Sequence, residues 1–297
     1  MKILIAEDDA ATRTMLECLT KKWGYAVVST SDGEEALRLL EAADGPNLAL
    51  MDWLMPGLEG PEICRRLRSS RSEKDPYRYV ILLTVKGEQE HVVRGLEAGA
   101  DDYVVKPFDP QELKVRLDVG RRIVELQEML RYNARHDVLT GLLNRRAGLE
   151  RLEEECARSR REKVPLSVAV LDLDRFKEIN DTYGHGGGDE VLRETAQRLR
   201  GLVRSYDVTA RLGGEEFLLL FPGTSREAAE EICERIRGQF ESEAFLSEKV
   251  FVTASIGVAG FGGDEDERTL LRRADAALYE AKNGGRNLVR SARCRPE

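Results

Sequence analysis

The first half of the chain alternates between short apolar runs and longer amphipathic stretches. Residues 2–6 form an apolar run of the kind found in buried parallel strands, and helical periodicity follows it. The pattern predicts strands at 2–6, 25–29, 48–51, 80–83 and 103–105, and helices at 11–22, 33–43, 61–68 and 89–98. Strict alternation of strand and helix predicts a doubly wound α/β domain with a parallel sheet, which we place at residues 1–120.

A long helix is predicted at residues 109–134, where the chain leaves the first domain. Pro110 suits the first turn of such a helix. Apolar side chains and one asparagine recur at spacings of 4, 3, 4 and 3 residues, at Val119, Ile123, Leu126, Leu130 and Asn133. This spacing and the polar residues around it favour a dimeric coiled-coil seam, in which the asparagine sets the register. The alternative is a helix that packs on its own domain.

The second half is typical of an α+β domain, which we place at residues 135–292. Strands are expected at 165–171 and 250–258, and helices at 190–203, 226–240 and 269–282. Gly213 and Gly214 lie between apolar runs, which indicates a hairpin, because glycine accepts the positive φ of a tight turn. Hairpin-joined strands among helices predict a mostly antiparallel sheet with the helices on one face.

The composition agrees with about two domains of ordinary globular type. The chain has 297 residues, of which 41% are hydrophobic and 34% charged, and its net charge is -8. No apolar run approaches the roughly 18 residues of a membrane span, and the acidic balance argues against DNA binding. No Cys-x-x-Cys pair occurs among Cys18, Cys64, Cys156, Cys233 and Cys294. We therefore expect a cytoplasmic protein with reduced cysteines, no zinc site, and no contact with membrane or DNA.

Chemically active side chains gather where the strands of the first domain end. In doubly wound folds, ligands bind beyond the carboxyl ends of the strands. The residues at those ends are Asp8, Asp9, Asp52, Thr84 and Lys106. Three carboxylates repel one another unless a divalent cation such as Mg²⁺ neutralises them, and Thr84 and Lys106 are suited to an anion built on Asp52. Acids at strand ends often only cap helices, but five matched positions favour a site.

The second half also places carboxylates at strand ends. Asp172 ends one strand, and Glu215 and Glu216 open the strand after the hairpin turn. Neighbouring strands would bring the three together, as a site for a metal and a triphosphate requires. A Gly-Gly-Glu-Glu turn alone also suits a solvated hairpin tip, so the interpretation depends on the rest of the domain.

Further polar residues of the second half match the parts of a guanine nucleotide. Asn180 and Asp189 offer the acceptor and donor groups that fit a guanine edge. Lys282 and Arg286 flank a glycine turn suited to phosphates. The chain has no Gly-x4-Gly-Lys-Ser/Thr loop, which excludes a P-loop NTPase.

The first 120 residues resemble the response regulator receiver domain. The motifs that carry the resemblance are Glu7-Asp8-Asp9, Asp52-Trp53-Leu54-Met55-Pro56-Gly57, Thr84 and Asp102-Tyr103 before Lys106-Pro107. The resemblance implies that Asp52 accepts a phosphoryl group from a cognate sensor histidine kinase. It also implies that Asp8, Asp9 and Asp52 hold Mg²⁺ or Mn²⁺.

The same resemblance implies a switch in this domain. Thr84, Tyr103 and Lys106 would respond to the phosphoryl group on the acceptor aspartate. Val85 departs from the family, which usually has alanine or glycine after the threonine. A β-branched side chain there is expected to crowd the phosphoryl site and to alter the kinetics of phosphorylation.

Residues 134–292 resemble the GGDEF family of diguanylate cyclases, in its Gly-Gly-Glu-Glu-Phe form. The motifs are Asp137-x-Leu139-Thr140, Asp172-x-Asp174-x-Phe176-Lys177, Asn180-Asp181, Tyr183-Gly184-His185, Gly188-Asp189, Gly213–Phe217 and Ala281-Lys282-x-x-Gly285-Arg286-Asn287. The resemblance implies that two GTP are joined into cyclic di-GMP with release of two pyrophosphates. Because one domain holds one GTP, it also implies that the enzyme acts as a homodimer.

Individual residues receive roles from the same resemblance. Asp172, the Leu173 carbonyl and Glu215 would hold Mg²⁺ or Mn²⁺, and Glu216 would be a further acidic ligand or catalytic helper. The guanine base would bind to Asn180 and Asp189. The phosphates would bind to the backbone amides of Phe176 and Lys177 and to the side chains of Lys282 and Arg286. Arg204 and Asp207 match the family's Arg-x-x-Asp site, at which cyclic di-GMP would act as a feedback inhibitor.

Three other functions remain open from the sequence. The domain could be a non-catalytic sensor of GTP or cyclic di-GMP, a scaffold driven by the receiver, or a cyclase with a mixed or adenine-containing product. A non-catalytic domain would be marked by losses among Asp172, Glu215, Lys282 and Arg286, and all four are present. On the cyclase interpretation, phosphorylation of Asp52 is expected to raise activity by changing dimer geometry or population through the long helix.

Overall fold

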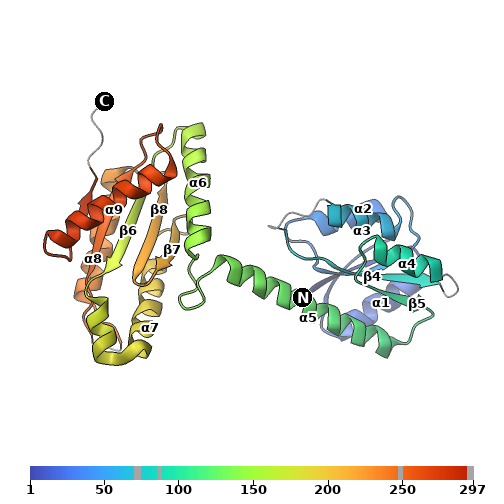
Figure 1. The fold of residues 1–297 in the computed structure, drawn as a ribbon. Coiled ribbons are helices and arrows are strands. Elements are labelled where there is room, and N and C mark those ends of the chain that lie inside the picture. Colours follow the sequence, from blue (N-terminus) through green and yellow to red (C-terminus); the bar gives the residue numbers. More distant parts are fainter. Residues whose placement is uncertain (70–74, 86–88, 247–249, 293–297) are drawn as a thin grey trace. The chain divides into compact units, whose positions relative to one another are not determined.

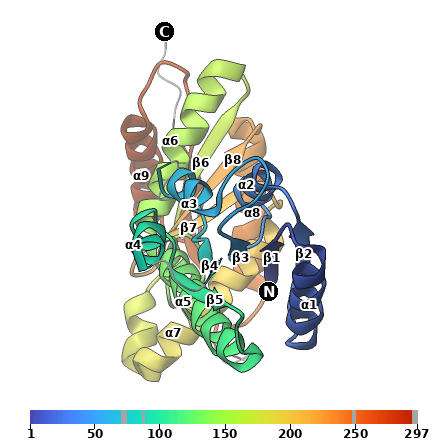
Figure 2. The same ribbon diagram turned by 90° about the vertical axis from the view of Figure 1, so that its right-hand side faces the viewer.

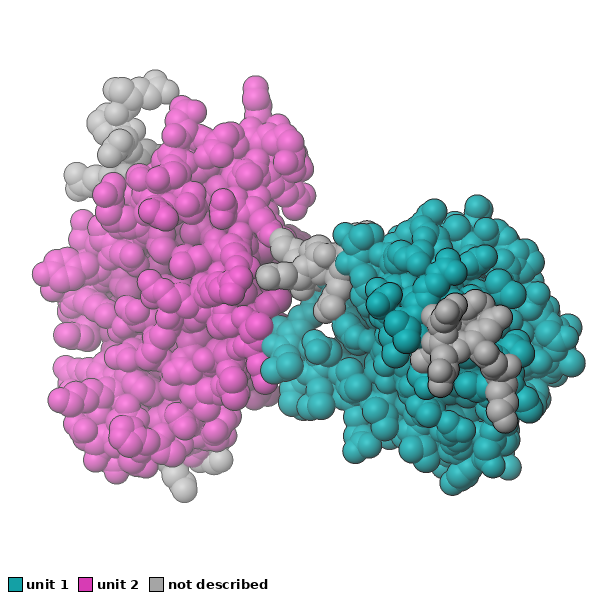
Figure 3. Space-filling model, turned by 45° about the vertical axis from the view of Figure 1, so that its right-hand side comes forward, with its two compact units in different colours: residues 1–131 teal, residues 132–297 magenta. Residues whose placement is uncertain are grey.

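The computed structural model describes residues 1–69, 75–85, 89–246 and 250–292. The chain divides into two compact units, Met1–Arg131 and Tyr132–Glu297, which Figure 3 shows in separate colours. None of the helices within the described ranges combines the length and apolarity needed to cross a bilayer. Cys18, Cys64, Cys156 and Cys233 are free thiols, and Cys294 lies outside the described residues.

Unit 1 is built on a parallel sheet of five strands in the order β2-β1-β3-β4-β5. Its apolar runs are buried on both faces, as Ile3, Leu4 and Ile5 show with no exposed surface. The strands are β1 (Lys2–Ala6), β2 (Ala26–Thr30), β3 (Leu48–Asp52), β4 (Tyr79–Val85) and β5 (Asp102–Lys106). The order reverses beside β1, which makes the carboxyl ends of β1 and β3 the expected place for a ligand. The predicted doubly wound fold is confirmed.

Helices cover both faces of this sheet. One core packs α1 (Ala10–Lys22) and α5 (Pro110–Arg135) on the sheet, and α1 lies beside β1 and β2 in Figure 2. The second core packs the opposite face under α2 (Gly33–Glu41) and α3 (Gly60–Ser69). The last helix, α4 (Gln89–Glu97), precedes β5. This layering leaves the strand ends open as a rim for polar side chains.

The long helix α5 begins at Pro110 and contributes to the core of unit 1. Leu113, Leu117 and Val124 are fully buried there, and Ile123 packs against the same core. Farther along, Leu126, Met129 and Leu130 are 58%, 60% and 64% exposed. The helix therefore packs on its own domain as far as Val124, while the apolar side chains beyond it are left uncovered in the single chain. Ile123 of the predicted seam packs against the domain core, and the coiled-coil seam stays a prediction.

Unit 2 contains a mixed sheet in the order β10-β9-β6-β8-β7. Only β9 and β10 are parallel, and the other neighbours are antiparallel, as predicted. The strands are β6 (Leu166–Leu173), β7 (Val208–Gly213), β8 (Glu216–Pro222), β9 (Ala254–Gly260) and β10 (Val289–Ser291). The strand expected from residue 250 begins at Ala254, and the three-residue β10 was not predicted because it is too short to show a period.

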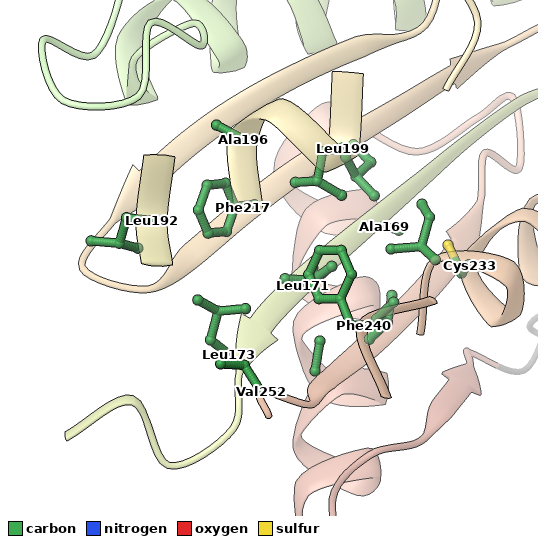
Figure 4. Close-up of a cluster of buried hydrophobic side chains, with 14 of the residues drawn as sticks. Ala169, Leu171, Leu173, Leu192, Ala196, Leu199, Phe217, Cys233, Phe240 and Val252 are labelled. Atoms are coloured by element: carbon green, nitrogen blue, oxygen red, sulfur yellow. The ribbon is translucent and has the colours of Figure 1, made fainter. Parts of the chain in front are cut away.

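Helices lie on both faces of the second sheet, so the prediction that they lie on one face is wrong (Figure 1). Along β6, Val168 and Val170 enter the core under α6 (Arg145–Glu162) and α9 (Glu267–Asn283). Ala169 and Leu171 enter the opposite core, under α7 (Phe176–Leu202) and α8 (Arg226–Ser242), which Figure 4 shows. Every residue of β6 is buried, and such a continuous apolar run indicates burial on two faces.

Gly257 on β9 sets the distance between the sheet and α9. A Cβ at this position would lie 2.1 Å from the Ala274 carbonyl oxygen and 2.2 Å from the Leu278 nitrogen. Both atoms belong to the backbone of α9, which cannot yield as a flexible side chain can. The absence of a side chain therefore lets the helix that carries Lys282 pack directly on the strand.

We predict that Gly257→Ala destabilises unit 2 by about 3 kcal/mol or more, because overpacking must move a whole helix. Gly238→Ala is the matched control, since Gly238 lies inside α8 with no atom near its missing Cβ. It should stabilise by roughly 1 kcal/mol through helix propensity. Urea unfolding followed by far-UV circular dichroism tests both. Equal midpoints for Gly257→Ala and the wild type would contradict the packing described.

Candidate functional site

The receiver site lies at the carboxyl ends of β1, β3, β4 and β5. Lys106 Nζ is 2.7 Å from Glu7 Oε2 and 3.0 Å from Asp52 Oδ2. Thr84 is buried on the neighbouring strand. The parallel register thus brings together Asp52, Thr84 and Lys106, which are far apart in the sequence.

Three carboxyl groups at this rim could hold a cation. Ligand oxygens of Glu7, Asp8 and Asp52 lie within 4.8 Å of one another. Asp9 is outside this group, because its Oδ2 caps α1 by accepting a hydrogen bond from the Thr12 amide at 2.7 Å. We therefore replace Asp9 by Glu7 in the proposed set of receiver ligands. Hard oxygen donors of this kind fit Mg²⁺ or Mn²⁺.

The electrostatics of the receiver rim also favour a cation. Burial raises the pKa of the fully buried Glu7 to about 7, although the hydrogen bond from Lys106 opposes the shift. Burial lowers the pKa of Lys106, but its hydrogen bonds to Glu7 and Asp52 outweigh burial and hold the pKa above its ordinary value. One lysine thus serves two carboxylates, and Asp8 adds a third negative charge beside them.

Two neighbouring residues concern the predicted switch. Tyr103 is partly buried and packs against the core under α2 and α3. Val85 is 70% exposed, whereas the side chain of Thr84 is buried, as alternation along a strand requires. The side chain of Val85 therefore points to solvent at the end of β4, and its expected effect on phosphorylation stays a prediction.

The candidate site of unit 2 is organised by the hairpin between β7 and β8. Gly213 and Gly214 have φ values of 145° and 52°, which a residue with a side chain rarely adopts. The register of β6 with β8 places Asp172 opposite Glu216, and the Leu173 amide donates to the Glu215 carbonyl at 3.3 Å. The fold therefore brings the three predicted carboxylates to one end of the sheet.

Lys282 joins these carboxylates from α9. Its Nζ lies 2.8 Å from Asp172 Oδ2, and the aspartate side chain is 10% exposed. Burial raises the pKa of Asp172, the ion pair with Lys282 opposes this shift, and Glu215 and Glu216 reinforce it. The crowded negative charge fits a divalent cation. Lys282 is paired with Asp172 Oδ2, one of the oxygens that such a cation would use.

The residues expected to bind guanine lie on α7. This helix bends at Gly184, whose φ and ψ of 71° and 172° are not helical. A Cβ on Gly188 would lie 2.0 Å from Asn180 Oδ1, so the asparagine side chain rests directly on this glycine. Asp189 follows the glycine, and both predicted guanine contacts are partly exposed. The bend thus brings together residues from either side of it.

The predicted phosphate contacts lie at two helix ends. Phe176 and Lys177 open α7, where free backbone N–H groups attract anions. Arg286 is exposed in the turn that follows α9, with a φ of 65°. Lys282 lies against the carboxylates through its ion pair with Asp172, and two residues separate the end of β6 from the start of α7.

Arg211 is a contributor that the sequence did not identify. Its Nε and Nη2 donate to the Gly214 carbonyl at 3.0 and 2.7 Å, and Nη1 lies 3.0 Å from Asp137 Oδ1. Asp137 also accepts from the amide and hydroxyl of Thr140. The hairpin turn is therefore braced against the segment that follows α5. Asp137 stands in one of the motifs, but its pairing with Arg211 across 74 positions is visible only in the fold.

Arg204 and Asp207 form a compact turn before β7. The Arg204 amide donates to Asp207 Oδ2 at 2.8 Å, and its Nη1 donates to the Tyr206 hydroxyl at 2.7 Å. Asp207 Oδ1 is buried and has no hydrogen-bond partner among the described residues. Burial raises the pKa of Asp207. Ser205, Tyr206 and Asp207 line a cavity of about 500 Å³, and Arg204 is exposed at the start of the same turn.

Comparison with known proteins agrees with this geometry. Residues 134–288 match the family described as diguanylate cyclase, GGDEF domain, and residues 3–118 match the response regulator receiver domain. Response regulator PleD from Caulobacter vibrioides is 37% identical over 304 residues, which cover 97% of this chain and 65% of PleD. Diguanylate cyclase DgcP from Pseudomonas aeruginosa is 46% identical over 164 residues, which cover 54% of this chain and 24% of DgcP.

Solved structures show the same likeness in the second unit. The coiled coil and GGDEF domain of DgcB from Caulobacter crescentus, in complex with c-di-GMP, is 34% identical, with a TM-score of 0.56 over 61% of this chain and 98% of that one. The chain belongs to the GGDEF family of diguanylate cyclase domains and carries a response regulator receiver domain in its first half. The family predicted from the sequence is confirmed. The chain spans 65% of the length of PleD.

We predict that Gly188→Ala weakens GTP binding about tenfold, because the new methyl group must displace Asn180, the residue predicted to contact the guanine. Gly186→Ala is the matched control, two residues earlier on the same helix, with no atom within 4 Å of the missing Cβ. Its affinity should stay within about twofold of the wild type. Titration with 3′-deoxy-GTP, which cannot react onward, measures both. Equal affinities for the two variants would show that Asn180 does not contact the bound nucleotide.

Proposed function

We propose that this protein is a diguanylate cyclase that joins two GTP into cyclic di-GMP with release of two pyrophosphates. One observation carries the proposal: Asp172, Glu215, Glu216 and Lys282 converge at one end of the sheet. The N-terminus of α7 and Arg286 supply the positive charge that a triphosphate requires. Membership of the GGDEF family supports the same reaction.

The reaction assigns a task to each part of the site. A divalent cation held by Asp172, the Leu173 carbonyl and Glu215 would neutralise the triphosphate and favour ionisation of a ribose 3′-hydroxyl. Lys282 would exchange Asp172 for a phosphate when substrate enters, because both anions compete for its single ammonium group. The amides of Phe176 and Lys177 would hold phosphate oxygens, and Glu216 would help as a further acid.

Guanine is the base that the site fits best. Asn180 and Asp189 offer an acceptor-and-donor edge, and a carboxylate accepts from the N1–H and N2 amino groups that adenine lacks. The mixed-product cyclase therefore ranks below a purely guanine enzyme. A non-catalytic sensor ranks lower still, because every residue of the proposed metal and phosphate site is in place.

A single domain holds one GTP, so we infer that the active form is a homodimer. The helix α5 passes from the receiver into the segment before the cyclase, from Pro110 to Arg135, without a break. Its exposed Leu126 and Leu130 are the positions at which two copies would pair. A histidine kinase would act through Asp52, and cyclic di-GMP would inhibit through Arg204 and Asp207.

We predict that Glu215→Gln lowers kcat at least about 100-fold, because it removes a ligand charge from the reacting centre without a change in size. The matched control is Glu231→Gln, which changes an exposed glutamate of α8. Product is measured by chromatography at saturating Mg²⁺, and circular dichroism verifies the fold. Normal product formation by Glu215→Gln would refute the catalytic assignment.

We predict that a phosphoryl mimic, beryllofluoride, raises cyclase activity by shifting the chain toward productive dimers. The mimic adds negative charge beside Thr84 and Lys106 and would change the face of the receiver that includes Tyr103. Initial rates measured against protein concentration, with and without the mimic, test this. Asp52→Asn should show no activation. Superimposable curves for the wild type, or activation that persists in Asp52→Asn, would rule the mechanism out.

A further inference from the structure

The second aspartate of the Asp172-x-Asp174 motif is not used by the reaction described above. Asp174 is 7% exposed, and both of its oxygens are engaged. Oδ1 accepts from the Ser255 hydroxyl at 2.6 Å, and Oδ2 accepts from the Thr253 hydroxyl at 2.8 Å. A third donor, the backbone N–H of Asn287, lies 2.9 Å from Oδ2. This last contact crosses from β6 to the turn after α9.

That turn has an unusual backbone. Gly285, Arg286 and Asn287 have successive φ values of 117°, 65° and 47°. Residues with side chains adopt the left-handed region only at a cost in free energy, and two in a row persist only where the surroundings hold them. The conformation directs the exposed side chain of Arg286, so whatever holds the turn also orients this guanidinium.

Asn287 is the point at which the turn is held. Its backbone N–H is bound by Asp174, and its side chain reaches α8, where Nδ2 donates to Glu241 Oε1 at 2.9 Å. Arg237 Nη1 donates to Asn287 Oδ1, also at 2.9 Å. Arg237 is itself ion-paired with Glu241 at 2.9 Å. Three anchors from two elements therefore converge on the residue next to Arg286.

We propose that Asp174 is a positioning residue for the triphosphate: through Asn287 it fixes the turn that aims Arg286 at the phosphates. This inference rests on the proposed function, because it takes the nucleoside triphosphate GTP as the ligand of that turn. Because both of its oxygens accept hydrogen bonds from protein donors, Asp174 would act on the substrate through the turn and not by direct contact. It links the end of β6, which carries Asp172, to the turn that carries Arg286. The link fixes the distance between the carboxylates at the end of β6 and the Arg286 guanidinium.

The test measures binding, so that it does not depend on turnover. The probe is 3′-deoxy-GTP, and GMP is the comparison ligand because it has the same base and lacks the outer phosphates. Asp174→Asn should weaken 3′-deoxy-GTP about tenfold, while GMP binding changes less than about twofold. Asp264→Asn is the matched control, an exposed aspartate between β9 and α9, and should change neither.

A double-mutant cycle with Arg286→Ala separates positioning from a direct effect on Asp172. In the Arg286→Ala background, Asp174→Asn should change the affinity for 3′-deoxy-GTP by less than about twofold. A tenfold loss that persists in this background would overturn the proposal, because Asp174 would then act through another group. Equal losses for GMP and 3′-deoxy-GTP would also overturn it.

Asn287→Ala keeps the test decisive if Asp174→Asn fails to fold. It leaves the backbone N–H in place, removes the links to Arg237 and Glu241, and puts alanine where the left-handed φ of 47° favours asparagine. Because both changes loosen the turn, about a threefold loss for 3′-deoxy-GTP is expected, with GMP binding unchanged. Unchanged binding of both ligands would overturn the proposal. A wild type that binds 3′-deoxy-GTP more tightly than GMP but makes no pyrophosphate would refute the cyclase assignment alone. No preference for the triphosphate would refute both.

Discussion

The register of β6 between β8 and β9 is the constraint on which the cyclase site depends. Seven residues of β6 pair with each neighbour, and every one of its side chains is buried. A slip of one residue would exchange the two cores and turn Asp172 to the opposite face. The packing of Val170 on one side and Leu171 on the other therefore fixes which oxygens meet at the hairpin. The chemistry of the site is a consequence of how the strand is buried.

Both units balance the repulsion among clustered carboxylates in the same way. Each gathers carboxylates at the end of a sheet, and each brings one lysine from a neighbouring element to balance them. Lys106 forms ion pairs with Glu7 and Asp52 in unit 1, and Lys282 forms an ion pair with Asp172 in unit 2. A lysine ammonium group that is paired with a carboxylate can exchange that partner for a phosphate oxygen. Each lysine is therefore placed to bind a phosphorylated group when one arrives.

Much of this arrangement could be predicted from the sequence, because strand ends and glycine turns are local signals. Asp52, Thr84 and Lys106 stand directly after apolar runs, and Glu215 follows two glycines, so each was placed without the fold. The sequence could not separate Asp9 from Glu7 because adjacent acids look alike, and only the structure shows that Asp9 caps a helix while Glu7 lies with Asp8 and Asp52. The roles of Arg211 and Asp174 depend on partners more than 70 positions away, which no local pattern specifies.

If the second unit performs diguanylate cyclase chemistry, the stoichiometry of its products will show it. Purified chain is incubated with GTP and Mg²⁺, pyrophosphate is assayed continuously, and the nucleotide product is identified by chromatography and mass spectrometry. We expect two pyrophosphates for each cyclic di-GMP, with no linear dinucleotide left at completion. Pyrophosphate release without a cyclic product, or no release at any protein concentration, would contradict it.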